Sequence, residues 1–466
     1  MFFQRFSHPT LSINSYLIGD KESGLCCIID PIRYVTPLIV TAENADLTIA
    51  YILETHVHAD FVSGAVELKN QLGGNPKIYC SAEGGEAWIP TYADVKAREG
   101  EVIYMGSIRL EALHTPGHTQ EHMSWICYDE SRSQETPWFI FTGDFIFVGG
   151  VGRPDLYGPA EAKVLSEKLY DSLFNKVLPL PDFTEVFPAH GEGSLCGNIS
   201  GGSLSSTMGY ERRFNPYFAD LPLELWATRV LENQKPFPSY FKRVKQINLK
   251  GATLLEELKI KEIQEKEINS LSSTAFLLDI RHPAAFAQCH IEGSVNIPFT
   301  ASYGFWVGWL VPDDKPIILI AESESRLSGA IEQLRLMGID QTIFTYVLAS
   351  GTIQQTCTSE SLKTISVVDL AHQIQEQTYT TENMLILDVR SESEYDSGHI
   401  QGAHHISLEK LIEQMGSLPQ DQTIATICRT GQRSSTAASL LKKYGFKNIL
   451  NVKGGMSAWK QVETGG

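Results

Sequence analysis

The stretch ETHVHADFVSG (residues 54–64) decides how the N-terminal half of this chain is interpreted. It contains the pattern H-x-H-x-D, formed by His56, His58 and Asp60, directly after an apolar run. Imidazole and carboxylate groups are common metal ligands, so this spacing is typical of a metal-binding turn. A further histidine commonly follows the aspartate in such turns, but this chain has Phe61 there. The stretch therefore indicates a metal site and raises the question of how many ions it binds.

Further polar residues follow other apolar runs of the first 245 residues. His118 lies in HTPGHT, Asp144 in FTGDF and His190 in VFPAHG, each where an expected strand gives way to a loop with Gly or Pro. Layered α/β domains gather their functional groups in loops of this kind. Because several strand-end loops carry His or Asp, the pattern favours metal binding over isolated structural histidines.

The order H-x-H-x-D, G-H-T, T-G-D and P-A-H resembles the ligand order of the metallo-β-lactamase superfamily over about residues 10–220. The longer motifs FTGDFIFVGGVGRPDL and PAHGEGSLCG are similar to its persulfide dioxygenase branch. The resemblance implies one iron ion held by His56, His118 and Asp144. Two histidines and a carboxylate form the facial triad of non-haem Fe(II) oxygenases, which leaves coordination positions open. Phe61 removes a ligand that the dinuclear members use for a second ion.

The same resemblance implies supporting roles for other residues of the domain. His58, Asp60 and His190 are expected to orient the ligands or metal-bound water, and packing of the loop is the alternative for His58. We expect substrate contacts from residues of VGRPDL, just beyond Asp144, and from the Gly/Ser-rich loop 191–209, which could approach a ligand closely. These residues are Arg153, Asp155 and Cys196, with a buried Arg153–Asp155 ion pair and a passive Cys196 thiol as alternatives.

The second half of the chain contains a repeat. FLLDIRHPAAFAQCHIEGSVNIP (276–298) parallels LILDVRSESEYDSGHIQGAHHIS (385–407), with matching Asp, Arg, His and Gly at one offset. A constant offset indicates duplication. In the later copy NMLILDV, TIATIC and NILNV predict strands, and SSTAASLLKKYGF predicts an amphipathic helix. Each copy is therefore expected to be a small parallel sheet covered by helices.

ICRTGQRSS (427–435) closes a strand and opens a helix in the later copy. Backbone N–H groups converge in such a loop at a helix N-terminus, which favours a thiolate and a negatively charged sulfur adduct on Cys428. With VKGGMSAW downstream, this copy resembles a rhodanese domain. The resemblance implies a persulfide carried on Cys428, with Arg433 as a catalytic partner and Arg429 as a substrate contact.

The earlier copy has Ala321 where the later one has Cys428, with Glu322 and Glu324 close by, although Arg326 matches Arg433. Alanine cannot carry sulfur, and the acidic residues disfavour an anionic adduct. We therefore expect an inactive rhodanese-like domain that serves as a scaffold, an interface or a docking site.

The overall composition limits the classes of partner. The net charge of −17 comes without a basic stripe, which excludes a nucleic-acid backbone as partner. No run is long enough to cross a bilayer, so we expect no membrane partner, and the N-terminus lacks the pattern of a signal peptide. The eight cysteines are scattered and predict reduced thiols in a cytoplasmic protein.

These observations predict an α/β protein with an N-terminal metallo-β-lactamase αββα sandwich and two rhodanese-like domains. We expect the domains at 1–245, 246–361 and 362–466. The function they favour is a persulfide dioxygenase with one Fe(2+) per chain, with zinc as a substitute ion. It would convert glutathione persulfide or a similar thiol persulfide and O2 to sulfite and thiol in sulfide detoxification. Cys428 would make or use thiosulfate, and we expect a homo-oligomer.

Two alternatives stay open at this point. One is a zinc-dependent thioester hydrolase of the glyoxalase II kind, which needs only a metal-bound hydroxide and a polarised carbonyl. The other is a sulfur carrier or sensor without catalysis, in which the metal domain is vestigial.

Overall fold

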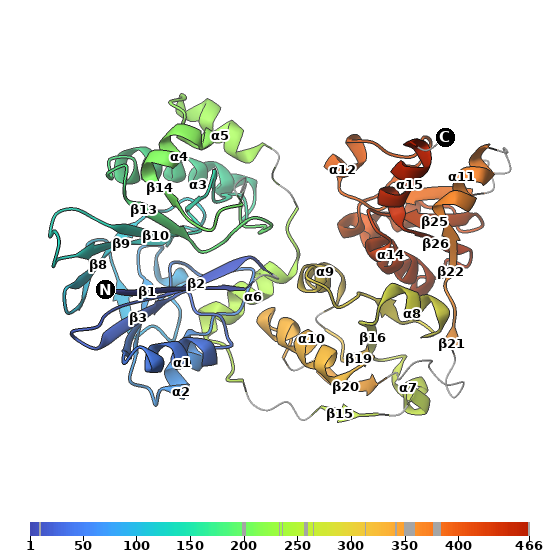
Figure 1. Ribbon diagram of the computed structural model, residues 1–466, viewed down its shortest axis with the longest axis horizontal. Coiled ribbons are helices and arrows are strands. Elements are labelled where there is room, and N and C mark those ends of the chain that lie inside the picture. The colour runs from blue at the N-terminus through green and yellow to red at the C-terminus, as the bar shows by residue number, and fades with distance from the viewer. Residues whose placement is uncertain are drawn as a thin grey trace. The chain divides into compact units, whose positions relative to one another are not determined.

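The computed structural model describes the chain except residues 9–10, 198–201, 233, 235, 256–259, 264, 313, 341–342, 349–358, 376–383 and 465–466. It divides into two compact units, residues 1–257 with 336–338 and residues 258–335 with 339–466 (Figure 1). The second unit holds both copies of the repeat.

The first unit contains two mixed sheets that pack face to face. The first sheet has the order β1-β2-β3-β4-β5-β6, and the second has the order β14-β13-β10-β9-β8-β7. The strands of the first sheet are β1 (Phe2–His8), β2 (Ile13–Asp20), β3 (Leu25–Ile29), β4 (Thr48–Leu53), β5 (Lys77–Ser81) and β6 (Val95–Ala97). Those of the second are β7 (Val102–Met105), β8 (Ile108–His114), β9 (Met123–Asp129), β10 (Phe139–Gly143), β13 (Glu185–Pro188) and β14 (Ser206–Thr207).

Helices cover the outer faces of the two sheets. They are α1 (Thr36–Asn44), α2 (Ala65–Gln71), α3 (Pro159–Asp171), α4 (Met208–Phe214) and α5 (Leu223–Leu231). The helix α6 (Tyr240–Lys250) contacts the loop that follows β4. The short elements are η1 (Glu86–Trp88), the π-helical η2 (Ser172–Val177), η3 (Pro216–Phe218) and the hairpin β11 (Ile146–Phe147) and β12 (Gly150–Val151). The helix α3 begins at a proline, which suits a first helical position because its missing N–H has no partner there.

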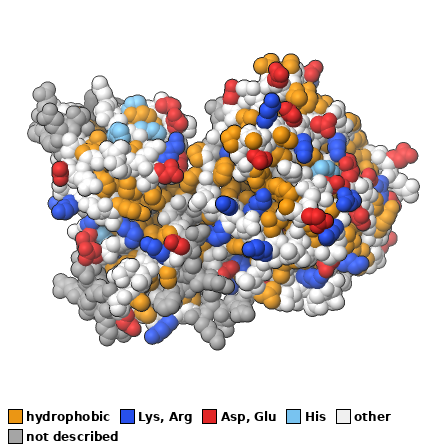
Figure 2. All heavy atoms as spheres, turned by 180° about the vertical axis from the view of Figure 1, so that it is seen from behind, with side chains coloured by type: hydrophobic (Ala, Val, Ile, Leu, Met, Phe, Trp, Pro, Cys, Tyr) orange, Lys and Arg blue, Asp and Glu red, His pale blue; other side chains and the backbone are white. Residues whose placement is uncertain are grey.

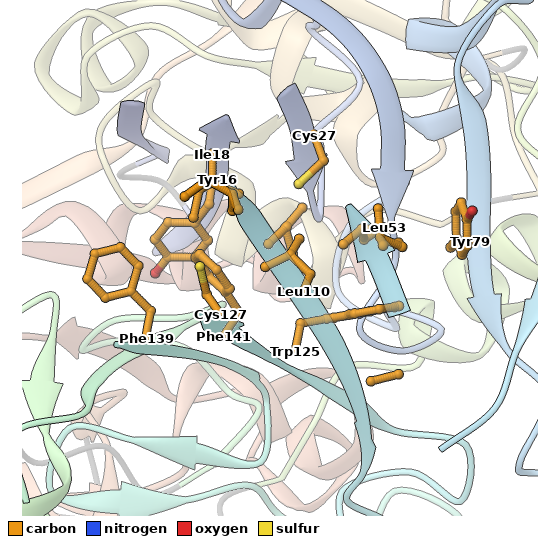
Figure 3. Packing of buried hydrophobic residues seen from close by; sticks show 14 of the residues in the cluster. Tyr16, Ile18, Cys27, Leu53, Tyr79, Leu110, Trp125, Cys127, Phe139 and Phe141 are labelled. Atoms are coloured by element: carbon orange, nitrogen blue, oxygen red, sulfur yellow. The ribbon is translucent and has the colours of Figure 1, made fainter. Parts of the chain in front are cut away.

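Three apolar clusters hold these layers together. The cluster between the sheets joins Tyr16 and Cys27 of the first sheet to Trp125 and Phe141 of the second (Figure 3). A further cluster joins the first sheet to α1 and α2, and another joins the second sheet to α3 and α5. Each sheet buries apolar residues on both faces, so one face packs against the other sheet and the opposite face packs against helices. The N-terminal αββα sandwich that the sequence predicts is confirmed.

The second unit contains two five-stranded parallel sheets, ordered β15-β20-β19-β16-β18 and β22-β26-β25-β23-β24 (Figure 1). The earlier copy has β15 (Lys261–Glu262), α7 (Glu265–Leu271), β16 (Phe276–Asp279), α8 (Pro283–Gln288), β17 (His290–Ile291), β18 (Val295–Asn296), α9 (Tyr303–Leu310), β19 (Ile317–Ala321), α10 (Glu324–Leu336) and β20 (Ile343–Leu348). The small parallel sheets expected for both copies are confirmed.

The later copy has the same order of sheet and helices. It consists of β22 (Lys363–Ser366), α11 (Val367–Gln375), β23 (Met384–Asp388), α12 (Glu392–Asp396), β24 (His404–His405), η4 (Leu408–Lys410), α13 (Leu411–Gln414), η5 (Met415–Ser417), β25 (Thr423–Ile427), α14 (Gln432–Lys443), β26 (Ile449–Lys453) and α15 (Gly455–Thr464). Before it, β21 (Ser359–Glu360) pairs with β17 of the earlier copy.

The duplication extends to individual contacts. Arg281 makes paired hydrogen bonds to Asp279, and Arg390 makes the same bonds to Asp388. His290 lies flat on Phe286 with 3.9 Å between ring centres, and the matching ring of His399 lies on Tyr395 at 3.8 Å. These side chains fix the strand end and the turn after it, so the matched residues have a structural role in both copies.

Among the described residues, no helix is both long and apolar enough to cross a bilayer. On the face shown in Figure 2, basic and acidic side chains are interspersed.

Candidate metal centre and cysteine loop

The three proposed metal ligands converge in the first unit, each in the loop that follows a strand. His56 follows β4, His118 follows β8 and Asp144 follows β10. Nε2 of His56 lies 3.5 Å from Oδ2 of Asp144, and Nε2 of His118 lies 3.6 Å from the same oxygen. His56 Nε2 and Asp144 Oδ2 are buried and have no hydrogen-bond partner among the described residues. Because buried polar atoms are normally paired, these atoms fit a bound cation.

Hydrogen bonds determine which nitrogen of each histidine faces the centre. The Thr55 hydroxyl donates to Asp30 at 2.8 Å, so its oxygen accepts a bond from Nδ1 of His56 at 3.0 Å. Nδ1 of His118 donates to the carbonyl oxygen of Arg153 at 2.9 Å. Both rings therefore present an unprotonated Nε2, as a metal ligand must. Burial lowers the pKa of both histidines and keeps the rings neutral.

His190 orients the carboxylate of Asp144. Its Nδ1 donates to Oδ1 of Asp144 at 2.6 Å, and its Nε2 donates to Oδ2 of Asp60 at 2.8 Å. Burial acts to lower the pKa of His190, but the charges of Asp144 and Asp60 outweigh it and raise that pKa well above 6.5. With Oδ1 held in this way, Oδ2 of Asp144 is the oxygen that faces His56 and His118.

The backbone at Asp144 is also fixed. Its N–H donates to Nε2 of His122 at 3.1 Å. Gly143 before it has φ +49°, and a Cβ there would lie 2.6 Å from both His122 Nε2 and Thr55 Oγ1. Only glycine fits this position. The run WFIFTGDFIFV consequently breaks at Asp144 into β10 and β11.

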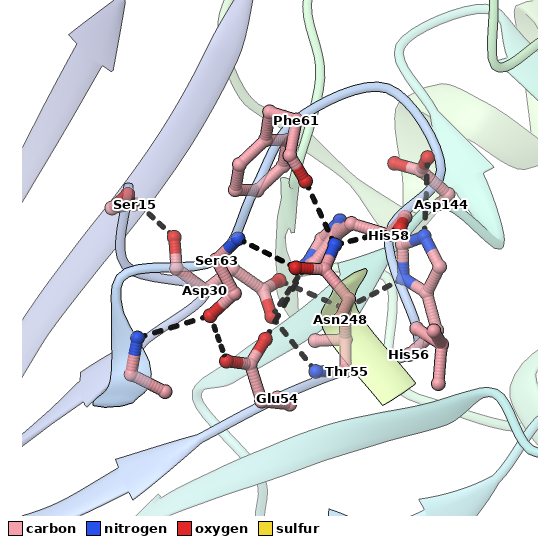
Figure 4. A network of polar contacts seen from close by, with 12 residues as sticks. Ser15, Asp30, Glu54, Thr55, His56, His58, Phe61, Ser63, Asp144 and Asn248 are labelled. Atoms are coloured by element: carbon pink, nitrogen blue, oxygen red, sulfur yellow. Dashed lines mark hydrogen bonds and ion pairs between the residues drawn. The ribbon is translucent and has the colours of Figure 1, made fainter. Parts of the chain in front are cut away.

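His58 is engaged by carboxylates other than Asp144 (Figure 4). Its Nε2 lies 3.2 Å from Oδ1 of Asp30 and 3.7 Å from Oε2 of Glu54. Burial acts to lower the pKa of His58, but Asp30 and Glu54 outweigh it and raise the pKa to about 9. Nε2 of His58 is therefore engaged by Asp30 and Glu54 and not by Asp144.

The loop that carries His58 is fastened from α6. Nδ2 of Asn248 donates to the carbonyl oxygens of His58 and Phe61, both at 2.8 Å, and its Oδ1 accepts from the Ser63 N–H at 2.9 Å. The backbone around the H-x-H-x-D turn is therefore fixed by a residue of a helix distant in the sequence.

Phe61 occupies the place where a further ligand is usual. The side chain is fully buried, and its ring centre lies 4.3 Å from that of His58 and 6.3 Å from that of His190. Cys196 also lies close to Asp60 and His190, with potential ligand atoms within 4.8 Å of one another. Burial and the charges of Asp60 and Asp144 raise the pKa of the Cys196 thiol well above 9, which keeps it protonated. In this cluster His190 already donates to both Asp60 and Asp144, and Phe61 contributes no ligand.

Arg153 is buried in an ion pair. Its guanidinium donates two hydrogen bonds to Asp155, at 2.7 and 2.8 Å, and a third to the carbonyl oxygen of Leu195 at 3.2 Å. The structure thus places the predicted substrate contacts Arg153 and Asp155 against each other, and a direct role toward substrate stays a prediction. Residues 198–201 of the loop 191–209 lie outside the described residues.

Cys428 lies at the end of β25 in the second unit, in the loop that leads into α14. The Gly431 N–H donates to its Sγ at 3.1 Å, and the Cys428 thiol donates to Ser434 Oγ at 3.4 Å. The start of α15 closes the loop from the other side, because the Met456 N–H donates to the Cys428 carbonyl oxygen at 2.8 Å. The backbone around the sulfur is therefore preorganised for a negative charge.

The two arginines of this loop differ in their partners. Arg433 donates to both carboxylate oxygens of Glu394, at 2.6 and 2.7 Å. Burial acts to raise the pKa of Glu394, but Arg433 outweighs it and lowers the pKa to about 2. Arg429 is exposed, and its guanidinium has no partner among the described residues. In the earlier copy, Ala321 ends β19 where Cys428 would be, and Arg326 pairs with Glu322 at 3.1 Å.

Several residues that build the metal centre are not among the sequence-predicted site residues. These are Asp30, Glu54, Thr55, His122 and Asn248, which hold the ligands or their loops by hydrogen bonds. The one signal for Asp30 is its place at the end of an apolar run before a proline, which matches the position of the predicted ligands.

Comparison with known families agrees with this arrangement. The model of the metallo-beta-lactamase superfamily matches residues 8–190, and that of the rhodanese-like domain matches residues 260–351 and 367–462.

Individual relatives match between about half and three quarters of the chain. The mitochondrial persulfide dioxygenase ETHE1 of Homo sapiens is 28% identical over 217 residues, which are 46% of this chain and 75% of that protein. The hydroxyacylglutathione hydrolase GloC of Haemophilus influenzae is 30% identical over 221 residues, 44% of this chain and 92% of that protein. A metallo-beta-lactamase structure from Staphylococcus aureus is 33% identical with a TM-score of 0.67, and it covers 75% of this chain and 99% of that chain.

Proposed function

Because the chain belongs to the metallo-β-lactamase superfamily and carries two rhodanese-like domains, we propose that it is a persulfide dioxygenase coupled to a sulfurtransferase. We assign the dioxygenase to residues 1–245, an inactive rhodanese-like domain to 246–361 and a catalytic one to 362–466. Membership of these families supports a metal-binding enzyme of sulfur metabolism. The dioxygenase and sulfurtransferase reactions are our proposal.

The set of ligands around Asp144 carries the proposal. His56, His118 and Asp144 supply two nitrogens and one oxygen toward a common point, whereas His58 is engaged elsewhere and Phe61 cannot bind a cation. This donor set fits a single Fe(II), which supplies open coordination positions for oxygen chemistry when it is bound. Hydrolysis by paired ions needs the second site that Phe61 blocks.

The proposed reaction is the oxidation of a low-molecular-weight thiol persulfide. The persulfide, O2 and water give the free thiol, sulfite and two protons, so the outer sulfur loses the four electrons that reduce O2. Hydrogen bonds from neighbouring residues hold His56, His118 and Asp144 in one protonation state while the persulfide is oxidised. Thr55 and the Arg153 carbonyl oxygen hold the Nδ1 protons of His56 and His118, and His190 holds the carboxylate of Asp144.

Cys428 is proposed to handle the sulfane sulfur. Its thiolate attacks the outer sulfur of a persulfide donor, the donor's S–S bond breaks, and the electron pair leaves with the donor's thiolate. Sulfite then takes the outer sulfur to form thiosulfate, and the electron pair of the broken bond returns to the Cys428 sulfur. The product of the metal centre is thus the acceptor at Cys428, which gives a chemical reason for joining both activities in one chain.

The similarity to hydroxyacylglutathione hydrolases supports a second candidate, a zinc thioester hydrolase. The two candidates are separated by metal analysis of protein produced with both iron and zinc supplied, together with oxygen uptake on glutathione persulfide and hydrolysis of a glutathione thioester. We expect oxygen uptake with iron and no thioesterase activity. Full zinc occupancy with thioesterase activity and no oxygen uptake would overturn the proposed function.

A further inference from the structure

A cavity of about 320 Å³ lies above the Cys428 loop and is lined by both copies of the repeat. The later copy contributes Arg429, Thr430 and Arg433, from the loop and the start of α14. The earlier copy contributes Phe305 and Trp306 of α9, together with Pro298, Thr300 and Ser302 before it. Cys428 itself is buried and precedes the lining residues Arg429 and Thr430 in the same loop. The inactive copy therefore supplies one wall of a cavity whose other wall is formed by the residues that follow Cys428.

Hydrogen bonds connect the two copies at α14, the helix whose first turns also line the cavity. Ser435 of α14 donates to Oδ1 of Asn296 at 2.7 Å, and the Asn296 N–H donates to Ser439 Oγ at 2.9 Å. All three residues are buried. Because these bonds fix β18 of the earlier copy against α14 of the later one, the residues that follow β18 have a defined place beside the Cys428 loop.

The wall from the earlier copy is aromatic. Phe305 and Trp306 are half-buried and pack edge to face, with 4.8 Å between ring centres. Aromatic faces bind apolar or planar organic groups and contribute little to binding a small hydrated inorganic ion. The cavity volume also lies at the scale of sites for organic ligands. Both features favour a donor with an organic part over inorganic thiosulfate.

The opposite wall carries a positive charge. The charge of Arg433 is balanced by Glu394, whereas Arg429 has no ion-pair partner among the described residues and lines the cavity. In the earlier copy the position that matches Arg429 is Glu322, which pairs with Arg326. This position is therefore positively charged in the copy that has the cysteine and negatively charged in the copy that lacks it. An unpaired guanidinium binds carboxylate or phosphate groups well.

We propose that this cavity is the binding site for an anionic organic persulfide, with its organic part against Phe305 and Trp306 and its acidic group on Arg429. The inference rests on the proposed sulfurtransferase activity of Cys428. It gives the inactive copy a function, because the specificity of the reaction at Cys428 then resides on a domain that carries no cysteine in its own loop.

The test compares three sulfur donors in the full-length protein, with cyanide as acceptor and thiocyanate as product. Glutathione persulfide is organic and carries carboxylates, 2-mercaptoethanol persulfide is organic and has no carboxylate, and thiosulfate is an inorganic anion. Trp306→Ala should lower the ratio of kcat/KM for glutathione persulfide to that for thiosulfate by about tenfold. Trp309→Ala, in the same helix but not lining the cavity, is the matched control and should leave this ratio as in the wild type.

Arg429→Gln should lower kcat/KM for glutathione persulfide about tenfold relative to 2-mercaptoethanol persulfide, and Arg429→Lys should recover part of the loss. If the wild type is active and the kcat/KM ratios between donors are unchanged in Trp306→Ala and Arg429→Gln, the proposed binding site is wrong but the transferase activity stands. Equal activity of the wild type and Cys428→Ser would overturn the proposed transferase instead. Calorimetry of S-methylglutathione with the Cys428→Ser protein then tests the cavity without turnover, and binding that Trp306→Ala does not weaken refutes it.

Discussion

Replacing His190 by alanine should weaken metal binding by one to two orders of magnitude although His190 is not a proposed ligand. The replacement removes the 2.6 Å hydrogen bond that holds Oδ1 of Asp144. A hydrogen bond to a charged group contributes about 1.5–3 kcal/mol. At 1.4 kcal/mol for each factor of ten, this corresponds to a dissociation constant about 10- to 150-fold higher. The loss of groups that orient metal ligands in other proteins costs about 10- to 100-fold, which is the same range.

The matched variant is Asp60→Asn. It removes the charge on the far side of His190 but keeps an oxygen that can accept the bond from Nε2 at 2.8 Å. We expect a smaller loss of metal affinity in this variant than in His190→Ala, because the bond between His190 and Asp144 is retained.

The assay titrates the apoprotein with Fe(II) under anaerobic conditions against a chelator of known affinity. The circular dichroism spectrum and melting temperature of each apoprotein serve as the check of folding, because transferase activity at Cys428 belongs to the other unit and does not report on this one. A dissociation constant for His190→Ala within twofold of the wild type would refute the argument, as would an Asp60→Asn variant that binds as weakly as His190→Ala.

Three further predictions concern other parts of the chain. Gly455→Ala places a Cβ 2.2 Å from the Cys428 carbonyl oxygen at a φ of +56°. This variant should therefore lose thiocyanate formation while its oxygen uptake persists. The control is Gly445→Ala, which has a φ of +94° but no atom within 4 Å of the added Cβ and should keep both activities. Because the pKa of Glu394 falls from 4.5 unfolded to about 2 folded, its pairing stabilises fully above pH 4.5 and is lost as pH falls toward 2. At neutral pH the melting temperature of Glu394→Gln should therefore lie below that of the wild type. The difference should be modest because the Glu394 side chain is 31% exposed. In acid the two melting temperatures should converge. Phe61→His should raise metal content toward two ions per chain and lower oxygen uptake, and a variant with unchanged metal content and activity would contradict the role given to Phe61.

Much of the architecture could be predicted because its signals are local. Apolar runs followed by His or Asp mark the strand ends of the first unit, and a constant offset marks the duplication. The αββα sandwich and the two parallel sheets follow from the resemblance that these motifs carry. The run WFIFTGDFIFV shows the limit of this approach, because the break at Asp144 depends on the positive φ of Gly143.

The contacts that support the site could not be predicted, because they join residues from separate strands and helices. Thr55 and Asp30 set the tautomer of His56, and Asn248 holds the loop from a helix nearly two hundred residues away. For Arg153 the sequence left two alternatives, and its position between Asp155 and Leu195 depends on how the loop folds. The cavity over Cys428 also needs the packing of one copy on the other, which no motif in either copy specifies.

Oxygen uptake by the iron-loaded protein on glutathione persulfide, measured together with sulfite, tests the central claim most directly. The account predicts one sulfite for each O2 consumed, with no uptake in Asp144→Ala or in zinc-loaded protein. Oxygen uptake that survives Asp144→Ala, or its absence in the iron-loaded wild type, would contradict the account.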